Sequence, residues 1–324
     1  MKLASYWRAA LVALGLLGLG GLLSFARWTP RDENTALPAT AVVASNANCR
    51  KCHAAVWQEW ETSLHSQAFS HPNVKAAFRH FGHDRQCESC HAAEPILRDL
   101  AAPVVLRSRD RDTGVDCLTC HALPDGRMAA RRTVPGAPCR PVSTPALTAS
   151  LHCGRCHTAI HEDWQASSFR GTDKNCQSCH MPAVNSRPGG RSHLCLGGHD
   201  AALVRSGATL ACRVEGDEVL VTVANHATGH NFPGERHNRV LLVQMIQRAK
   251  DGQITLAEQR TIKDMTPFRG ESSAEKIRAG EEFTARFPIV PPAATAEVQL
   301  LYKLFPFYAD RDALVVHRAE LELP

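Results

Sequence analysis

Five short stretches of the chain repeat one pattern of reactive side chains, C-x-x-C-H. The 324 residues include 13 cysteines and 17 histidines, and ten of the cysteines fall in these stretches. Two thiols one short turn apart can form thioethers with the two vinyl groups of a haem, and the next residue can supply the proximal imidazole to its iron. The pattern therefore predicts five covalently bound haems c, held by Cys49/Cys52/His53, Cys87/Cys90/His91, Cys117/Cys120/His121, Cys153/Cys156/His157 and Cys176/Cys179/His180.

Zinc ribbons, redox dithiols and structural disulfides also use C-x-x-C pairs. A zinc ribbon needs no histidine after each pair, and a redox dithiol occurs once, beside a βαβ pattern that this sequence lacks. Since only 17 of 324 residues are histidine, a chance histidine after all five pairs is very improbable. Haem attachment explains all five motifs together.

The N-terminus has the pattern of an export signal. Lys2 and Arg8 precede an apolar run from Ala9 to about Ala26, which suits a signal peptide and approaches the length of a membrane span. Residues 1–26 are therefore expected to be a signal peptide or an N-terminal membrane anchor, and both alternatives stay open. Either one predicts that the remainder lies on the periplasmic or extracellular side of the cytoplasmic membrane, where c-type haems are attached.

The formal net charge is +5. A basic chain can indicate nucleic-acid binding, but a ferric haem with two neutral axial ligands contributes about −1 through its propionates. The forked guanidinium of arginine matches a carboxylate well. The arginines are therefore interpreted as propionate partners, and no nucleic-acid partner is expected.

Three segments follow the N-terminal stretch. Residues 27–48 are expected to be a linker. Residues 49–204 are expected to form a pentahaem cytochrome c domain with short helices and long loops, in which the covalently fixed porphyrins are themselves the core. Residues 205–324 alternate apolar and polar residues between Gly-Asp, Asp-Gly and Pro-Pro turns, which predicts a β-sandwich. The predicted fold class is α + β, a mostly helical and irregular multihaem domain followed by an all-β sandwich.

The haem segment contains an internal duplication. Motifs one and two form one pair, motifs four and five form another, and motif three lies between them. The stretch "CRKCHAAVWQEWETSLH" aligns with "CGRCHTAIHEDWQASSF" through the motif, a tryptophan and a serine. The last aligned position is His65 in the first copy and Phe169 in the second, so the second copy lacks an imidazole that the first one offers.

Several stretches together resemble the exported multihaem cytochromes of the cytochrome c-554 type, relatives of hydroxylamine oxidoreductase and the multihaem nitrite reductases. They are the two repeats, "GVDCLTCHALPDG", "CQSCHMP", "RSHLCLGGHD" and "GHNFPGE", and the resemblance covers residues 49–240. In that family the histidine after W-x-x-S is a distal ligand to a haem other than the one held by its own motif. The resemblance implies this role for His65, and a distal role for His193 in "RSH".

The sequence also departs from the enzymes of this group. Multihaem nitrite reductases mark an open catalytic iron with C-x-x-C-K, whereas all five motifs here end in histidine. Hydroxylamine oxidoreductase cross-links a tyrosine to its catalytic haem, but Tyr6, Tyr302 and Tyr308 are the only tyrosines here and lie away from the motifs. No catalytic residue therefore has a counterpart, and electron transfer remains as the expected function.

Five haems need up to five distal ligands, and the candidates are His65, His161, His193, His199 and His230. On a helix, His161 shares a face with His157 and could reach a neighbouring haem. His199 follows two glycines that let the backbone approach a porphyrin, and His230 lies in a loop between predicted strands. The remaining histidines are interpreted as exposed or bonded to propionates: His71, His80, His83, His152, His226, His237 and His317.

Three cysteines lie outside the motifs: Cys139, Cys195 and Cys212. An oxidising compartment permits a Cys195–Cys212 disulfide, and buried free thiols are the alternative. The sequence does not decide between them.

The sequence thus predicts an exported cytochrome that passes single electrons through closely packed bis-histidine haems, between redox donor and acceptor proteins of the cell envelope. Two alternatives stay open. One is a multihaem oxidoreductase acting on nitrite or hydroxylamine at one five-coordinate haem. The other is a subunit of an extracellular cytochrome filament or homo-oligomer, in which copies exchange distal histidines.

Overall fold

The computed structural model describes residues 45–80, 82, 85–99, 101–235, 239–263 and 276–324. Every described residue belongs to one compact unit, Ala41–Pro324. The expected signal peptide or anchor, and the linker as far as residue 44, lie outside the described residues. Within the described ranges, no helix is long and apolar enough to cross a membrane.

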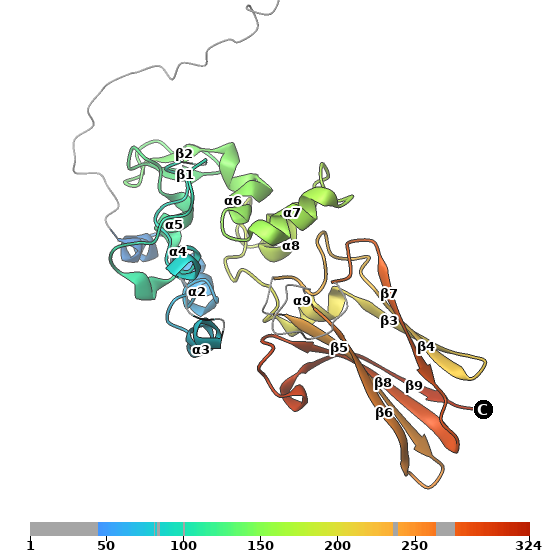
Figure 1. Ribbon diagram of the computed structural model, residues 1–324. Coiled ribbons are helices and arrows are strands. Elements are labelled where there is room, and N and C mark those ends of the chain that lie inside the picture. The colour runs from blue at the N-terminus through green and yellow to red at the C-terminus, as the bar shows by residue number, and fades with distance from the viewer. Residues whose placement is uncertain (1–44, 81, 83–84, 100, 236–238, 264–275) are drawn as a thin grey trace, which may run out of the picture. The chain divides into compact units, whose positions relative to one another are not determined.

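Short helices joined by loops make up the region of the five motifs (Figure 1). In chain order they are η2 (Asn46–Lys51), α2 (Ala54–Thr62), α3 (Pro72–His80), α4 (Arg85–His91), η3 (Arg111–Thr113), α5 (Cys117–His121), η4 (Pro145–Thr148), α6 (Ser150–Gly154), α7 (Thr158–Ala166), α8 (Cys176–His180) and α9 (Ala201–Ser206). In α4, α5 and α8 the helix ends at the motif histidine, so one helical turn sets the spacing between thiols and imidazole.

A small parallel pair, β1 (Met128–Ala130) with β2 (Pro141–Ser143), also lies in this region. The sequence did not predict it, since three-residue strands are too short to show an alternating pattern.

The duplication in the sequence is also a duplication in structure. Helices α2 and α7 have nine residues each and begin directly after a motif histidine. Each ends in the same way, because Ser63 Oγ donates to the Trp60 carbonyl at 2.7 Å and Ser167 Oγ donates to the Trp164 carbonyl at 2.8 Å. The backbone therefore leaves α2 and α7 with the same geometry, just before the aligned position that is His65 in the first copy and Phe169 in the second.

A buried polar network connects motif two with motif three. The Asp116 carboxylate caps α5 by accepting from Thr119 N at 2.9 Å, and Thr119 bonds back to the cap. Arg107 pairs with Asp116 at 2.9 Å and donates to the carbonyls of Ala93 and Gly114. Since a guanidinium offers five donors in a fixed fork, one side chain fixes the segments on both sides.

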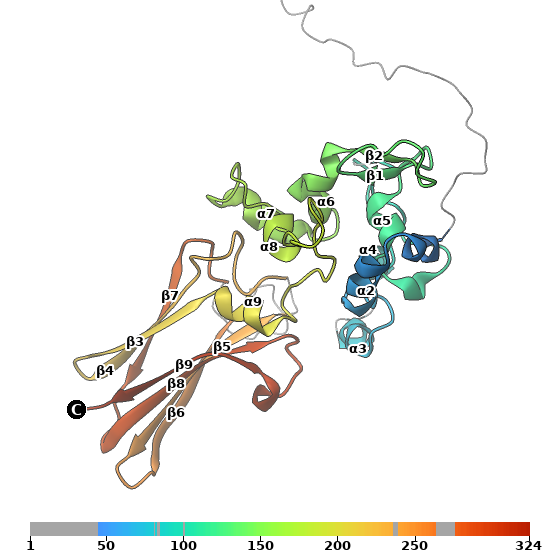
Figure 2. The same cartoon turned by 180° about the vertical axis from the view of Figure 1, so that it is seen from behind.

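Among the described residues after 208, seven strands form two antiparallel sheets, whose arrangement is seen in Figures 1 and 2. The three-stranded sheet has the order β3 (Thr209–Glu215), β4 (Glu218–Ala224), β7 (Glu282–Pro288). The four-stranded sheet has the order β6 (Ile254–Ile262), β5 (Val240–Ala249), β8 (Ala293–Lys303), β9 (Leu314–Glu322). Together with the short helices, these sheets confirm the predicted α + β fold class.

The period-two pattern explains how the two sheets pack. Alternate residues of β4 and β5 point into one core, where Val219, Val221, Leu241 and Val243 are fully buried, and Phe287 of β7 joins them. Each of these side chains contributes about 1.5–3 kcal/mol when removed from water. This core forms without a porphyrin, and it supports the loop between β4 and β5 that carries "GHNFPGE".

Candidate haem sites

In four motif histidines the ring nitrogen Nδ1 makes a hydrogen bond within the protein. Three bond to main-chain carbonyls: His91 to Ala68 at 2.6 Å, His121 to Ala129 at 2.8 Å and His180 to Leu196 at 2.6 Å. The fourth, His157, bonds instead to the Glu235 carboxylate at 2.9 Å. With Nδ1 donating its proton, the lone pair of Nε2 is left to bind iron, as a haem ligand requires.

Three motif histidines face a second imidazole across a narrow gap. The ring centres are 6.2 Å apart for His65 and His157, 6.3 Å apart for His121 and His193, and 6.2 Å apart for His180 and His230. A bond from imidazole nitrogen to a transition metal is about 2 Å long, so two imidazoles on opposite sides of one metal have centres about 6 Å apart. Each gap thus fits one iron.

The facing histidines also direct Nε2 towards the gap. His193 Nδ1 bonds to the Arg191 carbonyl and His230 Nδ1 bonds to the Asn231 carbonyl, both at 2.9 Å. Such bonds fix the tautomer and the ring orientation. In the described part of the chain, no three His, Cys, Asp or Glu side chains could hold a metal ion by themselves. Paired imidazoles suit a metal whose other four positions are filled by a porphyrin.

The protonation of these imidazoles suits ligation. Burial lowers the pKa of His65 to about 4, and burial likewise lowers the pKa values of His121, His180, His193 and His230. They are therefore neutral near pH 7, which is the form that binds metal. His157 differs, because its bond to Glu235 raises the pKa of the imidazole although burial opposes this.

Motif three positions His65. The Val115 N–H donates to the His65 carbonyl at 2.8 Å, and Trp60 Nε1 donates to the Val115 carbonyl at 2.8 Å. Gly114 is left-handed with φ 63°, and a Cβ there would overlap the His65 carbonyl oxygen. Glycine is therefore required at this close approach, and the segment that begins motif three holds the end of the first repeat.

An ion pair positions His193. Arg187 donates to both carboxylate oxygens of Glu59 at 2.7 and 2.8 Å, and the His193 N–H donates to the same carboxylate at 2.9 Å. Glu59 lies in α2, whereas Arg187 and His193 follow the last motif. The bonds to Arg187 and His193 lower the pKa of Glu59 although burial opposes them. The first repeat therefore anchors the segment that brings His193 to His121.

The sandwich positions His230. Asn225, at the end of β4, is fully buried and donates through Nδ2 to the carbonyls of His230 at 2.9 Å and Ile277 at 3.0 Å. Thr228 Oγ1 also donates to the His230 carbonyl, at 2.6 Å. A buried amide with both donors satisfied holds a loop in one shape.

Gly229 explains what Phe169 does. A Cβ on Gly229 would lie 3.1 Å from Trp164 and 3.2–3.3 Å from Phe169, so the loop rests directly on the second repeat. The apolar ring that replaces histidine therefore forms the surface on which the neighbouring His230 is carried. At this position the second copy has no candidate ligand, and its Phe169 instead packs against the loop that carries His230.

Two predicted ligands, His161 and His199, face no imidazole among the described residues. His161 is buried, and its ring stacks on Trp164 at 6.0 Å and fills the space beside Gly154. His199 is partly buried, and burial lowers its pKa. Their ligand roles stay predictions. The same holds for the partners of His53 and His91, which face no second imidazole within the described residues.

His152 is a candidate that sequence reasoning set aside. It is partly buried rather than exposed, and its buried Nδ1 has no hydrogen-bond partner among the described residues. Burial lowers its pKa to about 4. Its place directly before Cys153 is the signal that could have marked it.

The other histidines set aside have local partners or lie outside the described residues. His71 accepts from Asn73 N at 3.1 Å, and the His80 ring lies tilted against the Phe307 ring with centres 5.2 Å apart. His226 pairs with Glu282 at 3.2 Å, and His317 bonds to the Ala208 carbonyl at 2.7 Å. His83 and His237 lie outside the described residues.

Thiol contacts show which motifs are neighbours. Three pairs of thiols from different motifs are neighbours: Cys49 and Cys117, Cys90 and Cys156, and Cys153 and Cys176. Motif three therefore lies beside motif one, and motif four lies beside motifs two and five.

Three motif thiols do not lie in this interior. Cys52, Cys87 and Cys179 are exposed. Cys179 Sγ has a polar neighbour at the surface, since it lies 3.8 Å from Ser178 Oγ.

The reason lies in the pairing of the thiols. Each exposed cysteine shares its motif with a partly buried one that lies beside a cysteine of another motif; the buried members are Cys49, Cys90 and Cys176. One thiol of each pair is thus turned towards the neighbouring motif and the other towards solvent. The role of Cys52, Cys87 and Cys179 in haem attachment stays a prediction from the motif, with the thioether at a solvent-facing edge of the haem.

The remaining thiols form no disulfide. Cys139, Cys195 and Cys212 are free and partly buried, and burial raises the pKa of Cys195 and of Cys212 to about 11. The structure thus has free thiols, and the alternative of a Cys195–Cys212 bridge is not found.

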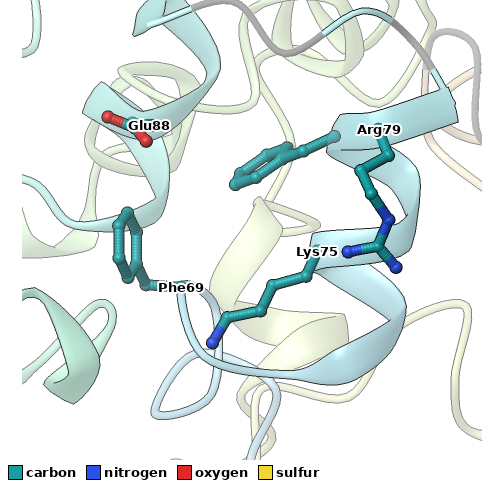
Figure 3. A pocket seen from close by; sticks show the side chains of 5 residues that line it. Phe69, Lys75, Arg79 and Glu88 are labelled. Carbon is teal, nitrogen blue, oxygen red and sulfur yellow. The ribbon is translucent and has the colours of Figure 1, made fainter.

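A shallow pocket opens beside motif two. Phe69, Lys75, Phe78, Arg79 and Glu88 line it. Figure 3 shows that Lys75 and Arg79 approach it from α3 and Glu88 from α4. The Phe78 ring also meets the His91 ring edge to face at 5.0 Å. Two cations and two aromatic rings therefore line this pocket, and one of the rings contacts the histidine of motif two.

Comparison with known proteins agrees with this geometry. Residues 48–122 match a model of the family described as cytochrome c554 and c-prime. No curated protein matches the chain. Among solved structures, the chain is similar to a penta-heme cytochrome c552 from Thermochromatium tepidum, with a TM-score of 0.65 and 17% sequence identity over 86% of this chain and 99% of that chain. At this identity the likeness concerns the fold.

The motifs, the family match over residues 48–122 and the fold support a multihaem c-type cytochrome with covalently bound haem c. Electron transfer is the general function of this class.

Proposed function

We propose that the chain is an exported pentahaem cytochrome that carries single electrons along closely packed bis-histidine haems at the cell envelope. The observation that carries this proposal is the set of three imidazole pairs with centres 6.2–6.3 Å apart. In each pair one ring closes a C-x-x-C-H motif and the other comes from a distant segment. The ligand sets are His157 with His65, His121 with His193, and His180 with His230.

Bis-histidine ligation favours electron transfer over catalysis. When bound, each haem would supply a one-electron couple, Fe(III) + e⁻ → Fe(II), and the paired histidines would hold it in both states, so the surroundings would reorganise little. An iron with both axial positions filled has none left for a substrate. The residues described above hold the rings in place, orient Nε2 and exclude water. Neighbouring motifs bring the haems close enough to pass the electron on.

Intact mass tests the haem count. The mature chain should exceed its polypeptide mass by five haem units, because all five motifs are complete. Four or fewer units in a fully matured sample would contradict the proposal.

The envelope location rests on the N-terminal pattern and on the covalent haems, since c-type haems are attached outside the cytoplasm. The expected partners are a redox donor and a redox acceptor protein on that side of the membrane. Cell fractionation and N-terminal sequencing test this part. A mature N-terminus near residue 27 indicates signal cleavage, and an intact N-terminus in the membrane fraction indicates an anchor. Haem-loaded protein in the cytoplasm would refute export.

One observation favours a second candidate, an oxidoreductase with an open iron at motif two. His91 faces no imidazole among the described residues, and the pocket beside it holds Lys75 and Arg79, which would attract a small anion such as nitrite. Oxidised wild-type protein distinguishes the candidates. Five low-spin haems that do not bind cyanide support the electron carrier, and one high-spin haem that binds cyanide supports the enzyme.

A further inference from the structure

The partner of Nδ1 separates His157 from the other motif histidines. The Nδ1 atoms of His91, His121 and His180 donate to neutral main-chain carbonyls, whereas that of His157 donates to the carboxylate of Glu235 at 2.9 Å. A carboxylate carries a full negative charge and makes a stronger, charge-assisted hydrogen bond. The haem held by motif four therefore has a different electronic environment.

The loop fixes Glu235 in this position. Glu235 is the last residue of the "GHNFPGE" stretch of the sandwich, five residues after His230. Its backbone is left-handed, with φ 50°. Its carboxylate oxygen Oε1 lies 2.9 Å from His157 Nδ1. About a third of the side chain remains exposed, at 33%.

A carboxylate at this position acts on the iron through the imidazole. It draws the Nδ1 proton towards itself and makes Nε2 a stronger electron donor. A stronger donor stabilises the ferric state more than the ferrous state, so the reduction potential falls. In the couple Fe(III) + e⁻ → Fe(II) the proton stays between Nδ1 and Glu235, and no bond to iron is broken.

Motif four also has the most neighbours among the motifs. Its Cys156 lies beside Cys90 of motif two, its Cys153 lies beside Cys176 of motif five, and His65 faces it from the first repeat. A change in potential at this haem therefore affects every path between those motifs.

We propose that Glu235 is a positioning residue that lowers the reduction potential of the haem held by motif four, at the junction of the haem array. The proposal rests on the proposed function, since it takes His157 and His65 as the ligands of that iron. Through Glu235 the sandwich sets the reduction potential of a haem that is attached to motif four, outside the sandwich.

The test compares Glu235→Gln with Glu282→Gln in potentiometric titrations of the mature protein. Glu282 is a matched control, because its carboxylate also pairs with a histidine, His226, at 3.2 Å, outside the motifs. In Glu235→Gln the ferric-to-ferrous ratio of one haem at fixed potential should fall about tenfold, a rise of about 59 mV for a one-electron couple. The other haems and the Glu282→Gln protein should titrate as the wild type does.

The His65→Ala background assigns the effect to motif four. Losing that ligand should make the same iron high-spin, so its titration can be followed by itself. Glu235→Gln should shift the high-spin signal, and Glu282→Gln should not. Glu235→Asp keeps the charge on a shorter side chain and should give a smaller rise, which serves as the test if Glu235→Gln does not mature.

Unchanged titrations of Glu235→Gln, or of Glu235→Asp in its place, would overturn the proposal, as would an equal shift in Glu282→Gln. A failure of the proposed function would be recognised by different measurements. Fewer than five haems by mass, or a high-spin motif-four haem in the wild type, would refute the ligand assignment before Glu235 is changed.

Discussion

His180 and His230 lie with ring centres 6.2 Å apart and ring planes 18° apart, although one closes a haem motif and the other belongs to a loop of the β-sandwich. The spacing and the near-parallel planes suit one iron between them. Both rings use Nδ1 to bond to a carbonyl, which leaves both Nε2 atoms for the metal. Under the proposed ligation, the sandwich would have a direct role in holding the motif-five haem.

His230→Ala should open the iron of motif five while leaving the haem attached, because thioether formation does not require the distal ligand. One haem in five should become high-spin and bind cyanide, as measured by electron paramagnetic resonance of the oxidised protein. His226→Ala, in the same loop, should keep the wild-type spectrum. A low-spin His230→Ala protein would mean that the sandwich supplies no ligand.

His65→Ala should open the iron of motif four in the same way, since His65 faces His157 and not the histidine of its own motif. High-spin signal and cyanide binding should each account for one haem, with five haems still present by mass. His71→Ala, whose ring bonds to Asn73 N, is the control. If the two variants have identical spectra, His65 is not a ligand.

Glu59→Gln should weaken the placement of His193. The neutral amide loses the charged bond to Arg187 and can accept only through one oxygen, so the segment should be destabilised by about 1.5–3 kcal/mol. Unfolding titrations should show this loss, and part of the motif-three haem should become high-spin.

Glu297→Gln provides the comparison for Glu59→Gln, since Glu297 pairs with Arg318 at 2.9 Å within the sandwich. It should leave the spin state unchanged. A fully low-spin Glu59→Gln protein of unchanged stability would show that the ion pair does not hold His193.

Gly229→Ala should disturb the loop that carries His230, because the added methyl would lie 3.1–3.3 Å from Trp164 and Phe169. We expect a cost of about 1–3 kcal/mol and partial high-spin character at the motif-five haem, seen by the same resonance measurement. Gly234→Ala is the matched control, since its nearest contacts would be 3.5 Å or longer. Equal behaviour of the two variants would argue that the loop does not rest on the second repeat.

Local patterns in the sequence predicted the haem motifs, the duplication and the strands. These features depend on residues close to one another in the chain, such as the thiol spacing of a motif or the alternation along β5. The fold class followed from them and is confirmed by the sheets and by the structural likeness.

The sequence could not show which histidine faces which motif. His65 meets His157 and His193 meets His121 only because motif three, the Glu59–Arg187 pair and the sandwich bring distant segments together. Glu235 ends the "GHNFPGE" stretch that carries the resemblance, but nothing in that stretch indicates that its carboxylate meets His157.

Burial was equally hard to read from the motifs. His152 looked ordinary, because its burial depends on the surrounding fold. Cys52 and Cys179 belong to complete motifs and are nevertheless exposed, because the spacing of a motif does not say which of its two thiols faces a neighbouring motif.

The spin and ligand state of the oxidised wild-type protein tests the central claim most directly. Near-infrared magnetic circular dichroism, which distinguishes bis-histidine iron from other ligand sets, can be quantified per chain. The account predicts at least three bis-histidine low-spin haems, one for each imidazole pair at 6.2–6.3 Å. Fewer than three in a sample that carries all five haems would contradict it.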